Sequence, residues 1–198
     1  ETFVGHDFKE MGKAAGKIAV DYLKTLNTDK PVCAWVSIPA TGQSSIDRFT
    51  GFKEVVLEAF PNAEVIEQGD SAGSRDSAQT TFENLLQVTP KIDVVSGHND
   101  AVVLGAYAAA QTQGRTEMKF IGLAGDKEVL KYIQDGNEVW LGEVLQDPVV
   151  LGETCMKALL EALEGKDLDS RYPIPLPVGI TPANIKEYNW QTWKWLGL

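Results

Sequence analysis

The stretch IDVVSGHNDAVVLGAYAAAQTQG, residues 92–114, contains the pattern that decides the fold. It begins with an apolar run of strand length, residues 92–96, and passes through a polar turn into a helix rich in alanine and leucine. Gly114 follows this helix and is a favourable C-terminal cap residue. The stretch therefore predicts a strand–turn–helix unit whose polar turn carries Asn99 and Asp100.

Similar units recur along the whole chain, because apolar runs of strand length alternate with stretches of helical period. This alternation is typical of the α/β class, in which helices cover both faces of a doubly wound parallel sheet. The proline-rich segment 173–177 suits an edge strand or an extended crossover, since proline lacks the amide donor that a central strand uses. The strands are expected at residues 2–4, 32–38, 64–67, 92–96, 119–123 and 139–145.

Capping residues predict where several helices begin. Ser44 has capping-box spacing with an aspartate three residues later, which places Arg48 in the first turn of a helix. Ser74 is expected to cap the next helix. Asp147, followed by a proline, starts a helix that is expected to end near Glu164.

The composition restricts the class of partner. With 43% apolar residues among 198, the chain can bury a proper core. Its formal charge of −10 argues against nucleic acid or an anionic membrane as partner, because phosphate contacts need clustered lysine and arginine. No apolar run approaches the roughly 18 residues of a spanning helix, and the start at Glu1 indicates a processed or shortened N-terminus.

The two cysteines give no sign of a metal site. Cys33 falls in a predicted strand and Cys155 in a predicted helix, and no CxxC or other metal-ligand spacing is present. Both are expected to be buried free thiols. The sequence predicts no metal and no cofactor.

Polar residues gather directly after the predicted strands. In open α/β sheets, ligands bind outside the carboxyl ends of the strands, so these residues are expected to line one groove. Each residue alone is weak evidence, but their recurrence on successive units favours a binding site. The candidates are Asp7, Arg48 at the end of the 39–48 loop, Arg75 at the end of the 68–75 loop, Asn99, Asp100, the 124–126 turn and Gln146.

Four segments, taken in order, resemble the ribose- and galactose-binding family of bacterial ABC importers. The resemblance implies one lobe of a type I periplasmic binding protein, a Rossmann- or flavodoxin-like fold. It also implies a non-enzymatic protein outside the cytoplasm, whose partners are a small sugar-like ligand and the membrane subunits of the importer. The segments are VGHD (4–7), RFTGF (48–52), GHNDA (97–101), which is followed by LGA (104–106), and QDP (146–148).

The resemblance implies ligand contacts for three residues. Arg48 matches an arginine that donates to sugar hydroxyls, Asn99 an asparagine that exchanges hydrogen bonds with a hydroxyl, and Gln146 a glutamine at a crossover between lobes. Each has a structural alternative: a surface ion pair for Arg48, a helix cap for Asn99, and hydrogen bonding within the hinge for Gln146. Asp100 is interpreted mainly as a helix cap, with ligand contact as its second role.

Two positions depart from the family pattern. Gly73 stands where ribose-type proteins stack an aromatic ring on the sugar, and Ala124 stands where they often have an aspartate. Arg75 and Ser71 are candidates to line the altered wall, although Arg75 has an exposed helix start as its alternative. Without the ring and the carboxylate, the site is expected to favour an oxidised, smaller or unusual polyol-like ligand over simple ribose or glucose.

The resemblance also implies that most of a second lobe precedes the position of Thr2 in full members of the family. The chain then divides into a ligand-binding lobe, residues 1–146, and a crossover helix with a tail, residues 147–198, that pack with the other lobe. The groove holds about half of the binding site. An apolar helix face without its partner lobe favours a homodimer of the chain. That face carries Leu151, Cys155, Leu159 and Leu163.

Two other classes of function stay open. The sensor domain of a lac-repressor-type regulator shares the fold but needs a helix-turn-helix headpiece before the chain. An α/β enzyme is the second alternative, because the fold alone does not fix function. Against it, the chain has no GxGxxG, P-loop or GxSxG motif, and only His6 and His98 are general bases near neutral pH.

Overall fold

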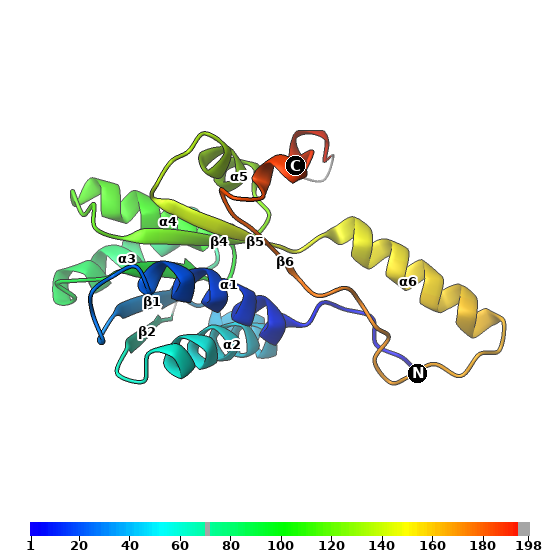
Figure 1. Ribbon diagram of the computed structural model, residues 1–198. Coiled ribbons are helices and arrows are strands. Elements are labelled where there is room, and N and C mark those ends of the chain that lie inside the picture. Colours follow the sequence, from blue (N-terminus) through cyan, green and yellow to red (C-terminus); the bar gives the residue numbers. More distant parts are fainter. Residues whose placement is uncertain (70–71, 194–198) are drawn as a thin grey trace.

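The computed structural model describes residues 1–69 and 72–193, so Ser71 lies outside the described residues. Within them, six strands form one sheet in the order β2–β1–β3–β4–β5–β6 (Figure 1). The sheet is parallel from β2 to β5, and β6 pairs antiparallel with β5 at the edge. This architecture confirms the predicted α/β class. The strands are β1 (Val32–Val36), β2 (Glu64–Gln68), β3 (Val94–Gly97), β4 (Lys119–Ala124), β5 (Trp140–Leu145) and β6 (Val178–Ile180).

Helices cover both faces of the sheet, with α1 and α2 on one face and α3, α4 and α5 on the other (Figure 1). The side chains of β1 show why: Ala34 and Val36 belong to one buried apolar cluster, and Cys33 and Trp35 to the other. The helices are α1 (Phe8–Leu23), α2 (Gln43–Ala59), α3 (Arg75–Val88), α4 (Asp100–Thr112), α5 (Lys127–Gln134) and α6 (Pro148–Leu163).

Three predicted helix starts are confirmed. The side chains of Ser74, Asn99 and Asp147 accept hydrogen bonds from the first amides of α3, α4 and α6. Gly114 follows α4 with a φ of 68°, which is the left-handed conformation expected of a glycine after a helix.

The capping box at Ser44 is wrong. A short 3₁₀ turn, Pro39–Thr41, leads directly into α2, and Gly42 takes the cap position with no side-chain hydrogen bond. The Ser44 hydroxyl donates to the Thr41 carbonyl instead of accepting from the helix. Because α2 already begins at Gln43, Arg48 lies in its second turn and not in its first.

The predicted first strand, residues 2–4, is not part of the sheet. Phe3 forms only an isolated bridge with Arg171, in which the amide of Tyr172 donates to the Phe3 carbonyl at 2.9 Å. The N-terminal residues therefore run beside the returning C-terminal segment, far from β1 along the edge of the molecule (Figure 1).

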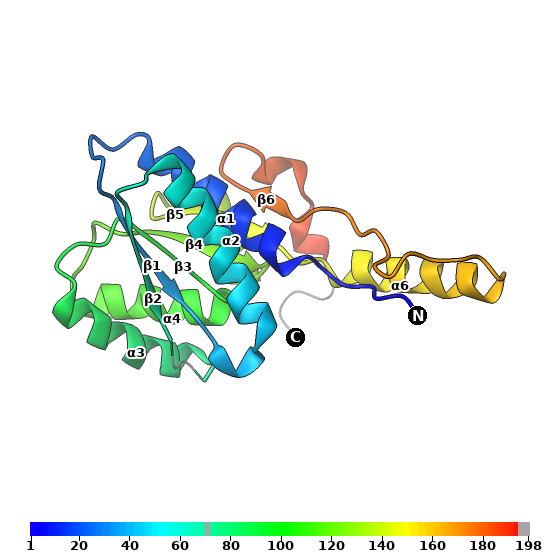
Figure 2. The same ribbon diagram turned by 90° about the horizontal axis from the view of Figure 1, so that it is seen from below.

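Helix α6 projects away from the sheet and its covering helices (Figures 1 and 2). Ala158 is its one buried residue, and Cys155 is exposed, so the prediction of a buried thiol is wrong at that position and right at Cys33. The cause is that the helix stands away from the sheet and packs against the returning segment, where the Tyr172 hydroxyl donates to Glu161 Oε2 at 2.8 Å. Its largely exposed apolar residues are Val149, Met156, Leu159, Leu160 and Leu163.

The C-terminal tail returns to the sheet. After β6, short 3₁₀ turns at Ile185–Glu187 and Trp190–Thr192 pack near α5, and the Trp190 indole donates to Gln134 Oε1 at 2.8 Å. Within the predicted second segment, 147–198, residues 178–193 thus contact the same lobe as residues 1–146. The boundary at residue 146 stays a prediction, and α6 is the part of that segment that stands clear.

Candidate functional site

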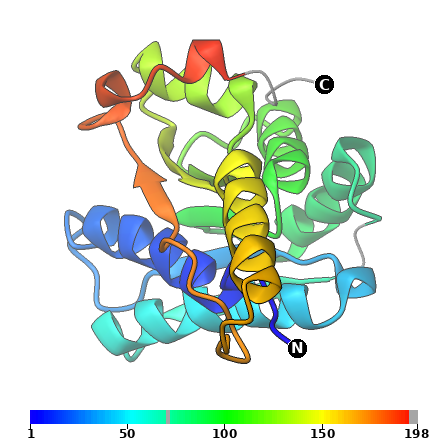
Figure 3. The same ribbon diagram turned by 90° about the vertical axis from the view of Figure 1, so that its right-hand side faces the viewer.

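The carboxyl ends of the strands form the edge of the sheet from which α6 projects, and Figure 3 looks at this edge. Three connections meet here: the N-terminal residues, the link from β5 into α6, and the segment that returns to β6. Hydrogen bonds join them, with Thr2 Oγ1 donating to the Asp169 carbonyl at 2.6 Å and His6 Nε2 lying 3.2 Å from the Asp147 carbonyl. The predicted groove residues lie at this edge, on the connections that follow the strands or in the first two turns of the next helices.

Arg48 lies at the centre of this edge, and only 4% of it is exposed. Its Nη2 donates to Gln146 Oε1 at 2.7 Å, and its Nη1 donates to the backbone carbonyl of His98. The guanidinium carbon lies 4.9 Å from the ring centroid of Phe8, a cation–π arrangement. Residues from α1, α2, the β3–α4 turn and the end of β5 therefore meet at one arginine.

Two glycines allow Arg48 to reach this position. A Cβ at Gly12 would overlap the Arg48 carbonyl oxygen, and a Cβ at Gly51 would overlap the Lys9 carbonyl oxygen. Helices α1 and α2 therefore cross so closely that only glycine fits at these two positions. The close crossing turns the second turn of α2 inward, so Arg48 is buried and the surface ion pair considered for it is wrong.

The electrostatic state of Arg48 follows from its burial. Burial lowers the pKa of the guanidinium to about 10, while the nearby Asp100 acts in the opposite direction, so the group stays charged at neutral pH. Arg48 makes no salt bridge with any residue in the described part of the chain. Its Nε is buried and has no hydrogen-bond partner there. Arg48 thus supplies a buried charge with unused donor capacity.

His98 is part of the site, although the sequence suggested it only as a possible base. Its Nε2 lies 3.5 Å from Thr41 Oγ1, and its Nδ1 is buried without a partner among the described residues. Burial, and then the charge of Arg48, lower the pKa of His98 to about 4, so the imidazole is neutral at neutral pH. A neutral imidazole offers one donor and one acceptor. Its position directly before Asn99 was the signal that could have identified it.

Asn99 has the capping role that was its structural alternative. Its Oδ1 accepts from the Val102 amide at 3.2 Å, which leaves the side-chain NH₂ with no partner in the described part of the chain. The oxygen and the amide nitrogen can therefore serve different purposes, one in the helix and one toward a ligand.

Asp100 does not cap α4, because Asn99 occupies the cap position. The Asp100 side chain is 4% exposed and points across to β4, where it accepts hydrogen bonds from the Leu123, Gly125 and Asp126 amides at 2.7, 2.9 and 2.8 Å. The capping interpretation is wrong, since the first residue of this helix faces the neighbouring strand. With both oxygens engaged inside the protein, Asp100 is left out of the proposed ligand contacts.

Asp7 and Arg75 lie at the margins of the site. Asp7 caps α1 through its Oδ1, which accepts from the Lys9 and Glu10 amides at 3.0 and 3.1 Å. Arg75 is the first residue of α3, and its exposed side chain forms an ion pair with Glu128 of α5 at 2.5 Å. Neither side chain is hydrogen-bonded to Arg48. A cavity of about 490 Å³ beside Asp7 is lined by His6, Phe8, Gln43, Asp47 and Arg171, among others.

The two positions that depart from the family pattern, Gly73 and Ala124, both have unusual backbone conformations. Gly73 has a φ of 84°, and a Cβ there would lie 3.2 Å from Ile38 Cδ1, so an aromatic side chain would require the loop to change. Ala124 has a φ of 135°, in a region that L-residues rarely adopt. Its methyl group supplies no acceptor to the groove.

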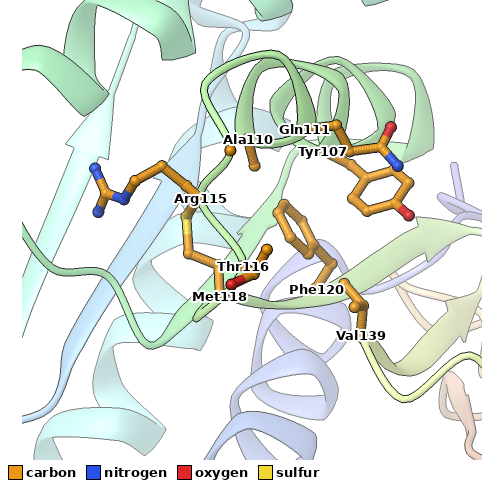
Figure 4. A pocket seen from close by; sticks show the side chains of 9 residues that line it. Tyr107, Ala110, Gln111, Arg115, Thr116, Met118, Phe120 and Val139 are labelled. Carbon is orange, nitrogen blue, oxygen red and sulfur yellow. The ribbon is translucent and has the colours of Figure 1, made fainter.

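A separate cavity of about 350 Å³ lies at the opposite end of the strands, next to the C-terminal end of α4 (Figure 4). Its walls are mainly apolar, and its Arg115 is already engaged, since it donates to the Leu86 and Thr89 carbonyls and pairs with Glu117. None of the predicted site residues lines it. Among the described residues, no cluster of three or more His, Cys, Asp or Glu could hold a metal, and no helix has the length and hydropathy to cross a membrane.

The periplasmic binding protein domain matches residues 2–167 of this sequence. The chain belongs to that family. Among curated proteins, it is 28% identical over 176 residues to the ribose import binding protein of Bacillus subtilis, and 27% identical over 150 residues to a xylitol-binding protein of Mycolicibacterium smegmatis. These matches cover 89% and 75% of this chain but 54% and 41% of the relatives. The chain therefore spans about half the length of the curated relatives it matches.

Solved structures of the family share the fold. The structure of an ABC transporter periplasmic solute-binding protein from Actinobacillus succinogenes with bound D-allose superposes with a TM-score of 0.82 at 19% identity, covering 94% of this chain and 63% of that one. An ABC transporter solute-binding protein from Mycobacterium smegmatis with bound glycerol gives a TM-score of 0.80 at 28% identity, covering 94% and 62%. The family assignment confirms the resemblance drawn from the motifs.

Proposed function

We propose that this periplasmic binding protein domain captures a small polyol or sugar-derived ligand outside the cytoplasm for an ABC importer. The observation that carries the proposal is the buried, charged Arg48 hydrogen-bonded to Gln146 at the carboxyl edge of the sheet. A buried guanidinium without a carboxylate partner is costly unless an oxygen-rich ligand can accept its hydrogen bonds. The names of the relatives, which include ribose and xylitol binders, support the same class of ligand.

The groups around Arg48 define the chemistry of the ligand. Arg48 supplies donors, Gln146 and the Asn99 NH₂ supply amide groups, and His98 supplies a neutral donor and acceptor. Among the residues that the structure describes, none places a carboxylate at Ala124 to accept from a ligand hydroxyl. A donor-rich wall favours ligands that bring acceptors, so we propose a sugar acid or a small polyol in preference to ribose or glucose.

Catalysis has less support than binding. A histidine with a pKa near 4 is a weak base at neutral pH, and the relatives are named as binding proteins. The sensor domain of a regulator has the same fold, and the sequence that precedes Glu1 in the gene decides between the two: a signal peptide means import, and a basic helix-turn-helix headpiece means regulation.

A melting screen of a protein that carries both lobes tests the proposal. A ligand present at 100 times its Kd stabilises the folded state by about 2.7 kcal/mol, enough to raise the melting temperature visibly. We expect sugar acids or small polyols to raise it, and calorimetric titration to give the affinities. A panel of these compounds that leaves the melting temperature unchanged would argue against the proposed ligand class.

Asn99→Ala is expected to lower stability by about 0.5–2 kcal/mol and to weaken ligand binding as well, because Asn99 both caps α4 and presents an NH₂ group. Asn99→Ser is the matched control, since serine keeps a capping oxygen and removes the NH₂. Thermal melting and calorimetric titration of both variants separate the roles. If the serine variant binds as well as the wild type, Asn99 has only its capping role.

The 198-residue chain is expected to self-associate through α6, whose apolar side chains are exposed in the lone lobe. Light scattering should show a dimer or larger species. Replacing Leu159 and Leu163 by lysine should return the chain to a monomer, whereas the same change at the exposed Val88 of α3 should not. A wild-type chain that is monomeric at high concentration would contradict this prediction.

A further inference from the structure

Two buried carboxyl groups lie beneath the groove, on the side of the sheet covered by α4 and α5. Asp100 is the first residue of α4, and Glu143 lies in the middle of β5 with 0% of it exposed. No role for Glu143 was predicted from its place in the sequence. Buried carboxyl groups are rare without a partner, so the surroundings of this pair require an explanation.

The two carboxyl groups together hold the turn that connects β4 to α5. Glu143 Oε1 accepts from the amides of Ala124 and Gly125, both at 2.9 Å, and Asp100 accepts from three amides of the same turn. Four consecutive amides therefore donate to the side chains of these two residues. Those amides belong to Leu123, Ala124, Gly125 and Asp126.

Glu143 Oε2 and Asp100 Oδ1 meet above Gly122. A Cβ at this glycine would overlap Glu143 Oε2 and would lie 2.5 Å from Asp100 Oδ1, so both oxygens occupy the space of one missing side chain. Glu143 Oε2 is buried and accepts no hydrogen bond from any described residue. An oxygen that receives no donor while it lies beside a carboxylate is the oxygen that carries a proton.

The protonation of the pair agrees with this geometry. Burial and the charge of Asp100 raise the pKa of Glu143 well above its ordinary value, and burial also raises the pKa of Asp100, although its hydrogen bonds act in the opposite direction. Asp126 in the turn and Arg48 of α2 are the charged groups that act on Asp100 from outside the pair, and α5 contributes the apolar Val129 above Gly122. Two buried carboxyl groups this close together are expected to share one proton.

We propose that Glu143 is a positioning residue of the groove, whose protonated carboxyl donates to Asp100 and with it holds the 123–126 turn in place. The turn reaches the site in two further steps. The Ala124 carbonyl accepts from the Gln146 amide at 3.2 Å, and the Gln146 side chain accepts from Arg48 at 2.7 Å. Ala124 has a rare backbone conformation, and the five hydrogen bonds from residues 123–126 to the two carboxyl groups hold it in place. The effect of this support on ligand binding rests on the proposed function, whereas the shared proton does not.

Glu143→Gln in the 198-residue chain tests the shared proton without any ligand. A carboxyl group whose pKa is raised on folding is protonated in the folded chain and ionised in the unfolded chain, so wild-type stability falls as the pH rises above about 4.5. Glutamine keeps the acceptor for Ala124 and Gly125 and places an NH₂ where the proton was. We measure the melting temperature of the glutamine variant minus that of the wild type at each pH. We expect this difference to be larger at pH 8 than at pH 5.

The control is Glu138→Gln, which removes an exposed charge just before β5 and should leave the pH dependence unchanged. Parallel pH profiles for the wild type and the Glu143→Gln variant would overturn the shared proton. Because no ligand enters this experiment, its result is independent of whether the proposed function is right.

Hydrogen exchange of the backbone amides tests the positioning role. The amides of residues 123–126 and of Gln146 should be protected in the wild type and in Glu143→Gln, and should exchange at least about tenfold faster in Glu143→Ala while those of the α4 interior do not. Protection of the turn in Glu143→Ala would overturn the proposal, as would a loss of protection that stops at residue 126. If the alanine variant fails to fold, the same amides in the wild type at pH 9 provide the comparison, since ionisation of the pair should release them.

Discussion

Arg48→Ala is expected to weaken ligand binding about 30- to 900-fold in a protein that carries both lobes, which corresponds to about 2–4 kcal/mol. The variant removes a charged donor whose Nη2 already holds Gln146 and whose buried Nε has no partner among the described residues. A ligand oxygen would then face an apolar gap or water. Calorimetric titration with a ligand found in the melting screen measures the effect.

Stability should change little in the same variant, because two effects oppose each other. The chain loses the hydrogen bonds from Arg48 to Gln146 and to the His98 carbonyl, but it also loses the cost of a buried charge without a salt bridge. The matched control is Arg75→Ala, which removes an exposed, ion-paired guanidinium from the same edge of the sheet. Equal losses of affinity in both variants, or none in either, would contradict a central role for Arg48.

The 198-residue chain by itself is expected to bind the ligand at least about 100-fold more weakly than a protein with both lobes, at millimolar affinity or below detection. Arg48, Asn99 and Gln146 form one wall, and each hydrogen bond to a ligand that stays open to water contributes only about 0.5–1.5 kcal/mol. Closure of a second lobe over the ligand excludes water and adds contacts. Titration of both proteins with the same ligand measures the difference.

The melting curve of the 198-residue chain serves as the control for this experiment, because weak binding is informative only if the chain is folded. Micromolar binding by a cooperatively folded chain would contradict the prediction. It would place the site within this lobe, and the cavity beside Tyr107 and Phe120 would then become the next candidate (Figure 4).

Local signals in the sequence were enough to predict most elements of the fold. Ser74 and Asp147 cap helices as expected, because a cap depends on a side chain and an amide only two or three residues apart. The start of α4 was also predicted, but Asn99 caps it in place of Asp100. The failure at Ser44 has the same origin: the 3₁₀ turn before α2 changes the backbone direction, and the capping pattern contains no information about that turn.

The site was predictable in part. Arg48 and Gln146 were identified from their positions after strands and from the family motifs, but their mutual hydrogen bond spans 98 positions of sequence. His98 was missed as a site residue because it was considered only as a base, although it directly precedes Asn99 at the end of a strand.

The sequence by itself determined the doubly wound sheet, most of the helix starts and the edge at which polar residues gather, because these follow from periodicity and from hydrogen bonds between near neighbours. Only the tertiary structure decided that Arg48 is buried, that Asp100 supports a turn with Glu143, and that α6 stands free. Each of these depends on how elements cross, such as α1 against α2 at Gly12. The burial and charge state of a side chain are set by the groups that such crossings bring together, and those groups are distant in sequence.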